Sequence, residues 1–159
     1  MPKIVVRTEI AAPIERCFDL ARSVDFHQHS MSGTGERAVA GVTSGLIGAG
    51  EEVTWEARHL GVRQRLTSRI VEFERPRLFV DEQVRGAFAS LRHEHRFEVA
   101  GEGRTVVTDD FAFRAPLGVL GRLAEVLFLK RYMRRFLEAH AARLKATLES
   151  DEWRGFIAN

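Results

Sequence analysis

A small set of ionisable side chains gives this sequence its clearest chemical feature. His93 and His95 form an H-x-H pair, Asp81 precedes them and Asp109 follows them. Because imidazole titrates near neutral pH, a histidine beside a carboxylate can accept and release a proton during a reaction. The same side chains can instead form a structural hydrogen-bond network or hold a ligand by its polar end. His93, His95 and Asp109 are therefore the candidate catalytic residues, with the two other roles left open.

A metal or nucleotide site is the next alternative that these residue types raise. Imidazole and carboxylate groups suit zinc or iron, but an H-x-H pair on one strand is a weak signal, so we predict no metal. The stretch GTGERA (33–38) fits G-x-G-x-x-A, yet no buried strand precedes it and no G-K-[ST] motif follows. We predict no cofactor and interpret this stretch as a loop at the mouth of a cavity.

The composition excludes several classes of protein. A chain of 159 residues, 45% of them hydrophobic, is expected to form one domain. Cys17 is the only cysteine, which excludes an intramolecular disulfide and zinc sites built on paired cysteines. A net charge of +2 is too small to indicate nucleic-acid binding. The sequence shows neither a signal-peptide pattern nor the roughly 20 apolar residues of a membrane span. We expect a cytoplasmic protein with no nucleic-acid partner and no integral membrane association.

The apolar periodicity predicts one order of elements along the chain. Two short helices are expected over 13–22 and 24–30, and a helix of about 30 residues after Pro116. Strands are expected over 3–11, near 36–40, and over 51–60, 62–73, 77–85, 88–99 and 104–114. The short connections between the later strands predict an antiparallel meander. The fold class is therefore α+β, with a curved seven-stranded sheet around the last helix over residues 1–150 and a C-terminal tail over 151–159.

The long helix carries an apolar stripe that should face the sheet. The stripe comprises Val119, Leu123, Val126, Met133, Leu137, Ala141, Leu144 and Leu148. Lys130, Arg131, Arg134 and Arg135 on the same helix could contact acidic lipid or a protein partner. A solvated helix face is the interpretation that we favour for these four residues.

Alternation along the strands assigns residues to the concave face of the sheet. Arg92, Glu94 and Arg96 belong to solvent, so the two histidines between them point inward. The strand 77–85 is ambiguous, and we assign Phe79, Asp81 and Gln83 to its inner face. The predicted ligand-binding residues are Trp55, His59, Gln64, Leu66, Asp81, Gln83, His93, His95, Phe97, Asp109, Phe111 and Phe113. Such an apolar surface with a few convergent polar groups is typical of a small-molecule site.

Several segments of the sequence resemble a known superfamily. DEQVRGAF (81–88), HEHRF (93–97), TVVTDDFAF (105–113) and APLG (115–118) are similar to the helix-grip (SRPBCC) superfamily, which includes START domains and the birch-pollen allergen. The nearest likeness is to its bacterial branch, often labelled polyketide cyclase/dehydrase or cell-division protein, and it spans roughly 3–149. The resemblance implies a cavity between the sheet and the C-terminal helix. It supplies neither a ligand nor a catalytic set.

Three functions follow from these patterns. The favoured one is binding or carrying of a small amphipathic or hydrophobic molecule in an internal cavity. A cyclase- or dehydratase-type enzyme, with cavity His and Asp residues as general acid and base, is the first alternative. The second is an interaction module that uses the aromatic tail with Trp153, Phe156 and Ile157. The oligomeric state is left open, with a homodimer as one alternative.

Overall fold

A single antiparallel sheet organises the protein, here described as a computed structural model that covers residues 2–59 and 61–158. The strand order is β1-β7-β6-β5-β4-β3-β2, so β2 to β7 lie side by side in chain order and β1 pairs with β7. The strands are β1 (Lys3–Ile10), β2 (Arg37–Gly41), β3 (Glu52–His59), β4 (Val62–Glu74), β5 (Leu78–Gly86), β6 (Ser90–Gly101) and β7 (Arg104–Arg114). The predicted seven-stranded antiparallel sheet is confirmed, and so is the meander predicted for its later strands. Residue 60, the end of the strand predicted over 51–60, lies outside the described residues.

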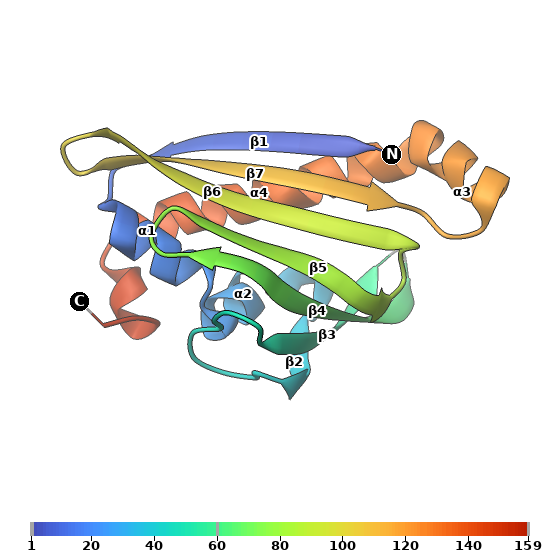
Figure 1. The fold of residues 1–159 in the computed structure, drawn as a ribbon, viewed down its shortest axis with the longest axis horizontal. Helices are drawn as coiled ribbons and strands as arrows, with labels where there is room; N and C mark the ends of the chain where they lie inside the picture. The colour runs from blue at the N-terminus through green and yellow to red at the C-terminus, as the bar shows by residue number, and fades with distance from the viewer. Residues whose placement is uncertain (1, 60, 159) are drawn as a thin grey trace.

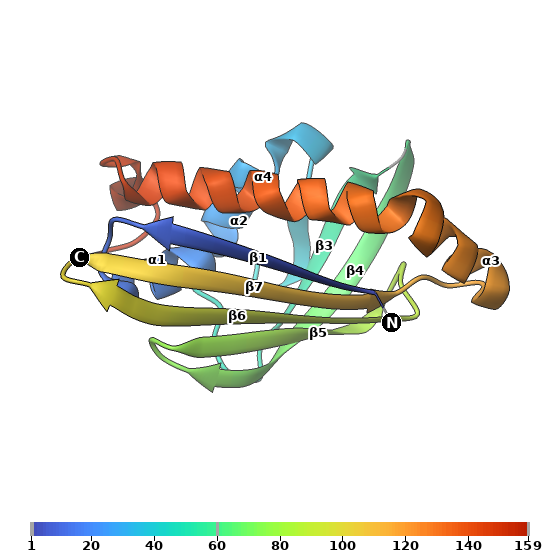
Figure 2. The ribbon, with the colours of Figure 1, turned by 90° about the horizontal axis from the view of Figure 1, so that it is seen from above.

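The helices cover one face of this sheet. α1 (Ile14–Ala21) and α2 (Val24–Ser30) follow β1, and a 3₁₀ turn, η1 (Ser32–Thr34), leads into β2. The Ser23 hydroxyl caps α2 by accepting from the backbone N–H of Phe26, as its position before the helix suggests. α4 (Lys130–Leu148) packs against β1 and runs along the sheet, as Figures 1 and 2 show from two sides. The two short helices and the long final helix are thus present.

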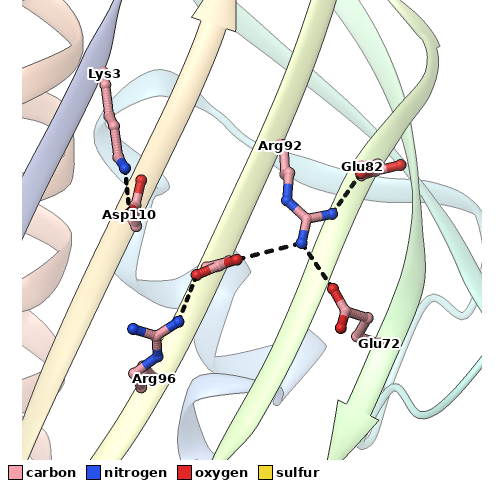
Figure 3. A network of polar contacts seen from close by, with 7 residues as sticks. Lys3, Glu72, Glu82, Arg92, Arg96 and Asp110 are labelled. Carbon is pink, nitrogen blue, oxygen red and sulfur yellow. Dashed lines mark hydrogen bonds and ion pairs between the residues drawn. The ribbon is translucent and has the colours of Figure 1, made fainter.

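The outer face of the sheet carries the charges that its alternation predicts. The Arg92 guanidinium donates to Glu82 at 2.6 Å, to Glu72 at 2.7 Å and to Glu94 at 3.2 Å. Arg96 donates to the other oxygen of Glu94, and Lys3 pairs with Asp110 at 3.0 Å (Figure 3). Exposed ion pairs of this kind add little stability each. Their importance is that they fix which face of β5 and β6 meets water, and therefore which face meets α4.

Two apolar clusters occupy the space between the sheet and the helices. Phe18 of α1 lies at the centre of the larger cluster, with its ring edge-on to Phe73, Phe79 and Phe97 at centroid distances of 5.2 to 5.4 Å. The smaller cluster joins Phe111 and Phe113 of β7 to the first half of α4. The cavity described below lies between these clusters and is lined by members of both.

The apolar stripe of the last helix follows the prediction only in part. Met133, Leu137, Ala141, Leu144 and Leu148 are buried as expected. Val119, Leu123 and Val126, however, are 79%, 55% and 83% exposed, so the inward orientation predicted for them is wrong. The helix consists of α3 (Gly118–Ala124), a π-helical segment η2 (Glu125–Leu129) and α4, and α3 projects past the end of the sheet (Figure 2). The wider π turn changes which side chains face the sheet, and no strand lies under α3 to cover them.

The C-terminal tail packs back onto the main cluster. The tail contains a 3₁₀ turn, η3 (Glu152–Gly155), and its Trp153 and Ile157 are buried members of the larger apolar cluster. Phe156 packs against the same cluster. Trp153 and Ile157 are therefore not available to a protein partner and Phe156 is only partly exposed, which argues against the tail-mediated interaction module. Among the described residues, no helix is both long and apolar enough to cross a bilayer.

Candidate ligand-binding cavity

A cavity of about 340 Å³ lies between the inner face of the sheet and α4. Its wall is mostly apolar and draws on β3, β4, β5, β6 and β7, with α2 and α4 on the other side. The apolar lining includes Val53, Leu66, Ile70, Phe111, Met133 and Leu137. Alternation places the first four on the concave face, while three- and four-residue spacing directs the helical residues toward it. The volume is at the lower end of the range for small-molecule pockets.

The polar part of the wall is unusually rich in imidazole. Of the six histidines in the chain, five line the cavity, and the exposed His29 is the exception. The five are His27, His59, His93, His95 and His140. Buried polar groups without partners are destabilising, so the partner of each ring decides what it can do.

Strand register assembles the central group, the His–Asp cluster of Asp81, His93, His95 and Asp109. Asp81 pairs with His93 across β5 and β6, and His95 pairs with Asp109 across β6 and β7. Diagonal neighbours on one face are also within reach of long side chains. The Nε2 atom of His95 lies 2.9 Å from Asp81 Oδ2, and the Nε2 atom of His93 lies 3.0 Å from Asp109 Oδ1. The cluster therefore spans three strands on the concave face.

His95 is held as a cation between the two carboxylates. Its Nδ1 atom is 3.1 Å from Asp109 Oδ1, so both ring nitrogens face a carboxylate oxygen and both must carry a proton. Burial alone would lower the pKa of His95, but the hydrogen bonds to Asp109 and Asp81 outweigh it and raise this pKa to about 9. Burial alone would raise the pKa of both carboxyl groups, and the bonds from the histidines hold them below their usual values instead. The ring of His95 also stacks on Phe79 and packs against the tilted ring of His93.

The ligand atoms of this cluster are close enough together for a metal site, but the protonation of its imidazole nitrogens does not suit one. One ligand atom each of Asp81, His93 and His95 lies within 4.8 Å of the others. A metal ligand must present a deprotonated imidazole nitrogen, whereas His95 donates from both of its nitrogens. The arrangement of donors and acceptors thus fits an internal ion-pair network better than a metal centre.

The cluster also presents unpaired acceptors to the cavity. His93 donates through Nε2 to the ionised Asp109, which leaves its Nδ1 without a protein partner among the described residues. In that part of the chain no fully buried side-chain nitrogen or oxygen lacks a hydrogen bond, so His93 Nδ1 and Asp81 Oδ1 must reach open cavity space. Asp81 Oδ1 is a hydrogen-bond acceptor, and His93 Nδ1 accepts in the neutral form of the ring.

A second polar group lies on the helix side of the cavity. The Ser30 hydroxyl donates to the backbone carbonyl of His27 at 3.1 Å, so it accepts from His140 Nδ1 at 2.9 Å. Burial lowers the pKa of His140 to about 3, which keeps this ring neutral and leaves Nε2 as a further acceptor. His27 bonds Glu36 at 2.5 Å and packs on Trp55 with ring centroids 4.2 Å apart.

A third imidazole closes the remaining side of the cavity. The Nδ1 atom of His59 lies 2.8 Å from the Tyr132 hydroxyl, which joins the end of β3 to the start of α4. Burial lowers the pKa of His59, so its neutral form is favoured. Burial likewise raises the pKa of Tyr132. This pair is therefore a neutral hydrogen bond across the cavity.

The residues predicted from sequence fall into two groups. Those that line the cavity are Trp55, His59, Gln64, Leu66, Asp81, His93, His95 and Phe111. The other four, Gln83, Phe97, Asp109 and Phe113, lie outside its wall. Gln83 instead accepts from the Phe88 N–H and donates to the Phe88 carbonyl, which closes the β5–β6 turn. Phe97 and Phe113 belong to the two apolar clusters, and Asp109 lies behind the histidines that it orients.

Eight polar residues of the wall are not among the predicted ligand-binding residues. They are Arg22, Ser23, His27, Glu36, Arg65, Ser68, Tyr132 and His140. Helical spacing could have identified His140, because it follows Met133 by seven residues and Leu137 by three and so shares their face of the last helix. His27 and Glu36 carry no such signal, because the packing of α2 and the path of the loop after it bring them to the cavity.

Comparisons with known proteins agree on this architecture. Residues 1–149 match the model of the family described as polyketide cyclase / dehydrase and lipid transport. No curated protein is significantly similar to the chain. Among solved structures, the protein TTHA0849 from Thermus thermophilus superposes with a TM-score of 0.70 at 19% identity, over 92% of this chain and 99% of that one.

Two further structures extend the likeness. A START superfamily protein from Mycobacterium smegmatis gives a TM-score of 0.68 at 15% identity, over 92% of this chain and 97% of that one. The major latex-like protein 151 from Panax ginseng gives 0.65 at 17% identity, over 94% and 98%. At these identities the likeness establishes the helix-grip fold and nothing more specific.

Proposed function

The chain belongs to the polyketide cyclase / dehydrase and lipid transport family, and we propose that its cavity binds and carries a small amphipathic molecule. The observation that carries this proposal is the cavity itself, an apolar space of about 340 Å³ with its polar groups gathered at the His–Asp cluster and around His140. A site of this size suits one compact molecule. The apolar body of the ligand would pack on residues such as Ile70, Phe111 and Leu137.

The free atoms of the wall specify the polar end of that molecule. Asp81 Oδ1 and His140 Nε2 accept hydrogen bonds, as does His93 Nδ1 in the neutral ring, and none of the three has a protein donor in the described residues. A ligand with a hydroxyl or N–H group would satisfy them, whereas a carboxylate would meet the charge of Asp81. We therefore propose that the ligand is a neutral hydrogen-bond donor such as an alcohol or phenol.

Titration with naphthol tests this proposal, because the probe combines a fluorescent apolar body with one hydroxyl donor. We expect saturable binding at one site, and binding about tenfold weaker for methoxynaphthalene, which lacks the donor. Ala57→Phe should fill part of the cavity and abolish binding, since Ala57 lines the wall and is buried. Ala142→Phe on the exposed side of α4 is the matched control and should bind as the parent does. Equal binding by both variants would refute the cavity as the site.

An acid–base enzyme is the second candidate, and the bond between His93 and Asp109 favours it. A carboxylate on Nε2 fixes the ring and strengthens Nδ1 as a base toward a molecule in the cavity. In this alternative the protein is a cyclase- or dehydratase-type catalyst. His93 would remove a proton from a bound substrate and return it to the product.

The enzyme candidate predicts a clean separation of binding from turnover. With candidate polyketide-type substrates, His93→Gln should lower kcat by roughly a hundredfold or more while naphthol affinity changes little. The variant His29→Gln removes the exposed histidine outside the cavity and serves as the control. If His93→Gln lost only affinity, the ring would be a binding group and the catalytic alternative would be wrong.

A further inference from the structure

A second feature of the protein lies outside the cavity, in the segment of residues 117–128 at the start of the last helix. This apolar segment exposes a run of large hydrophobic side chains to solvent. They are Leu117 at 79%, Val119 at 79%, Leu120 at 69%, Leu123 at 55%, Val126 at 83%, Leu127 at 65% and Phe128 at 49% exposure. Val119, Leu123 and Val126 recur at steps of four and three, so they share one helix face. A patch of this size is uncommon on a soluble monomer and marks a surface for interaction.

The apolar segment is fixed to the body and is not a loose end. The side chain of Glu125 is buried and accepts from the backbone N–H of Ala115 at 2.6 Å. Gly121 lies so close to the carbonyl oxygen of Pro116 that a Cβ atom there would overlap it. Both contacts tie the helix to the end of β7 and hold the apolar face outward. The exposure of these side chains is thus built into the fold.

The charges around the apolar segment have one sign. Exposed basic groups flank it at Arg114, Arg122, Lys130, Arg131 and Arg135, with Arg134 half-buried beside them. The one acidic residue between positions 114 and 137 is Glu125, and its carboxylate is buried. Over residues 114–137 the exposed charged side chains are therefore all cationic, which is complementary to an anionic surface with an apolar interior. A second copy of the same surface would bring like charges together, which disfavours self-association here.

The apolar segment is continuous with the wall of the cavity. Pro116, directly before it, and Leu129, directly after it, both line that wall, as does Met133 one turn further. The surface therefore lies where a molecule could pass between the cavity and whatever covers the segment.

We propose that residues 117–128 dock the protein on the surface of an anionic lipid bilayer. The side chains of Val119, Leu123 and Val126 enter the boundary between headgroups and acyl chains, while Lys130, Arg131 and Arg135 contact anionic headgroups. Docking does not require a ligand in the cavity, so this proposal and the proposed function fail separately. It adds a site for loading and unloading beside the cavity.

Cosedimentation with vesicles tests the docking surface. Vesicles of equal parts phosphatidylcholine and phosphatidylglycerol should bind the protein, and phosphatidylcholine alone should bind it far more weakly. The triple variant Val119→Gln/Leu123→Gln/Val126→Gln should weaken binding at least tenfold. Its matched control, Val5→Gln/Val62→Gln/Val99→Gln, changes three exposed valines elsewhere and should bind as the parent does.

The charge contribution has its own pair of variants. Lys130→Gln/Arg131→Gln/Arg135→Gln should weaken binding to the anionic vesicles roughly a hundredfold, because each cation near such a surface contributes about a factor of five. Arg7→Gln/Arg104→Gln/Arg143→Gln makes the same change of charge at exposed positions outside the segment and should have a much smaller effect.

The opposite results are equally clear. Failure of the parent protein to bind the anionic vesicles, or unchanged binding by the apolar triple variant, would overturn the proposal. A dimer in solution that this variant dissociates, without vesicle binding, would assign the segment to contacts between copies and also overturn it. Naphthol titration of the same variant shows that its cavity is intact, which separates loss of docking from loss of fold.

Discussion

The two carboxylates around His95 set the chemistry of the candidate site at the scale of single residues. Asp81 and Asp109 each accept from one ring nitrogen of His95, which fixes both protons of that ring. With one imidazolium ring between two carboxylates, these three groups keep one net negative charge. What the cavity then meets is the free nitrogen of His93 and one oxygen of Asp81. The ligand therefore has to provide donors.

The protonation of His95 predicts how the stability of the protein depends on pH. The pKa of His95 is raised from 6.5 to about 9 in the folded state, so the bound proton stabilises the fold below pH 6.5. That contribution, of the order of 3 kcal/mol, should disappear as the pH rises from about 6.5 through about 9. Urea unfolding across this range measures it.

The variant His95→Gln should lose this particular dependence. Its free energy of unfolding should be lower than that of the parent near neutral pH, because two buried carboxylates lose their cation. The difference between the two proteins should shrink as the pH approaches 9. His29→Gln, at the exposed histidine, should follow the parent throughout. A constant difference between His95→Gln and the parent at every pH would show that His95 is not the titrating group.

At the scale of elements, antiparallel register and helix spacing do most of the positioning. The exchange of His and Asp across β5, β6 and β7 needs only correct alternation and correct pairing, both of which short turns impose. α3 depends on more particular contacts, since Gly121 and Glu125 hold it against the end of β7. The joint between α3 and β7 therefore depends on the identity of these two residues.

Substitution of Gly121 tests that joint. In Gly121→Ala the new methyl group would meet the Pro116 carbonyl, so α3 must shift and the free energy of unfolding should fall by about 1–3 kcal/mol. Amide hydrogen exchange over 118–129 should become faster. Gly155→Ala places a methyl group in open space in η3 and should change stability by less than about 0.5 kcal/mol. Equal effects of the two substitutions would mean that the close approach at Gly121 is not what holds α3.

The elements also show how far the sequence alone can predict this protein. Alternation was sufficient for the strands, and it correctly directed Asp81, His93 and His95 inward. It could not separate the cavity wall from the apolar clusters, because Phe97 and Phe113 share the face of the histidines but pack against α1 and Phe88 instead. The helical stripe failed at Val119 and Leu123, where an unforeseen π segment and the end of the sheet changed the environment. Periodicity shows which residues share a face of an element, but only the packed structure shows what covers that face.

At the scale of the whole molecule, the sheet and α4 enclose a cavity, and the exposed apolar segment of residues 117–128 lies at one end of it. The sheet side of the cavity wall is rigid because each strand from β3 to β7 is hydrogen-bonded to a neighbouring strand on both sides. The cavity remains open because α4, together with the short α1 and α2, does not fill the concave face of the sheet. A family described by both cyclase/dehydrase and lipid transport functions is consistent with a cavity that could be used for either purpose.

The most direct test of the cavity as a binding site is the naphthol titration read on the histidines themselves. Heteronuclear NMR resolves each imidazole group, and five of the six rings line the cavity. We predict saturable shifts of the cavity rings, largest for His93, with His29 unchanged as the internal control. Shifts confined to His29, or no shift of any ring at saturating naphthol, would contradict the proposal that this cavity binds an amphipathic donor.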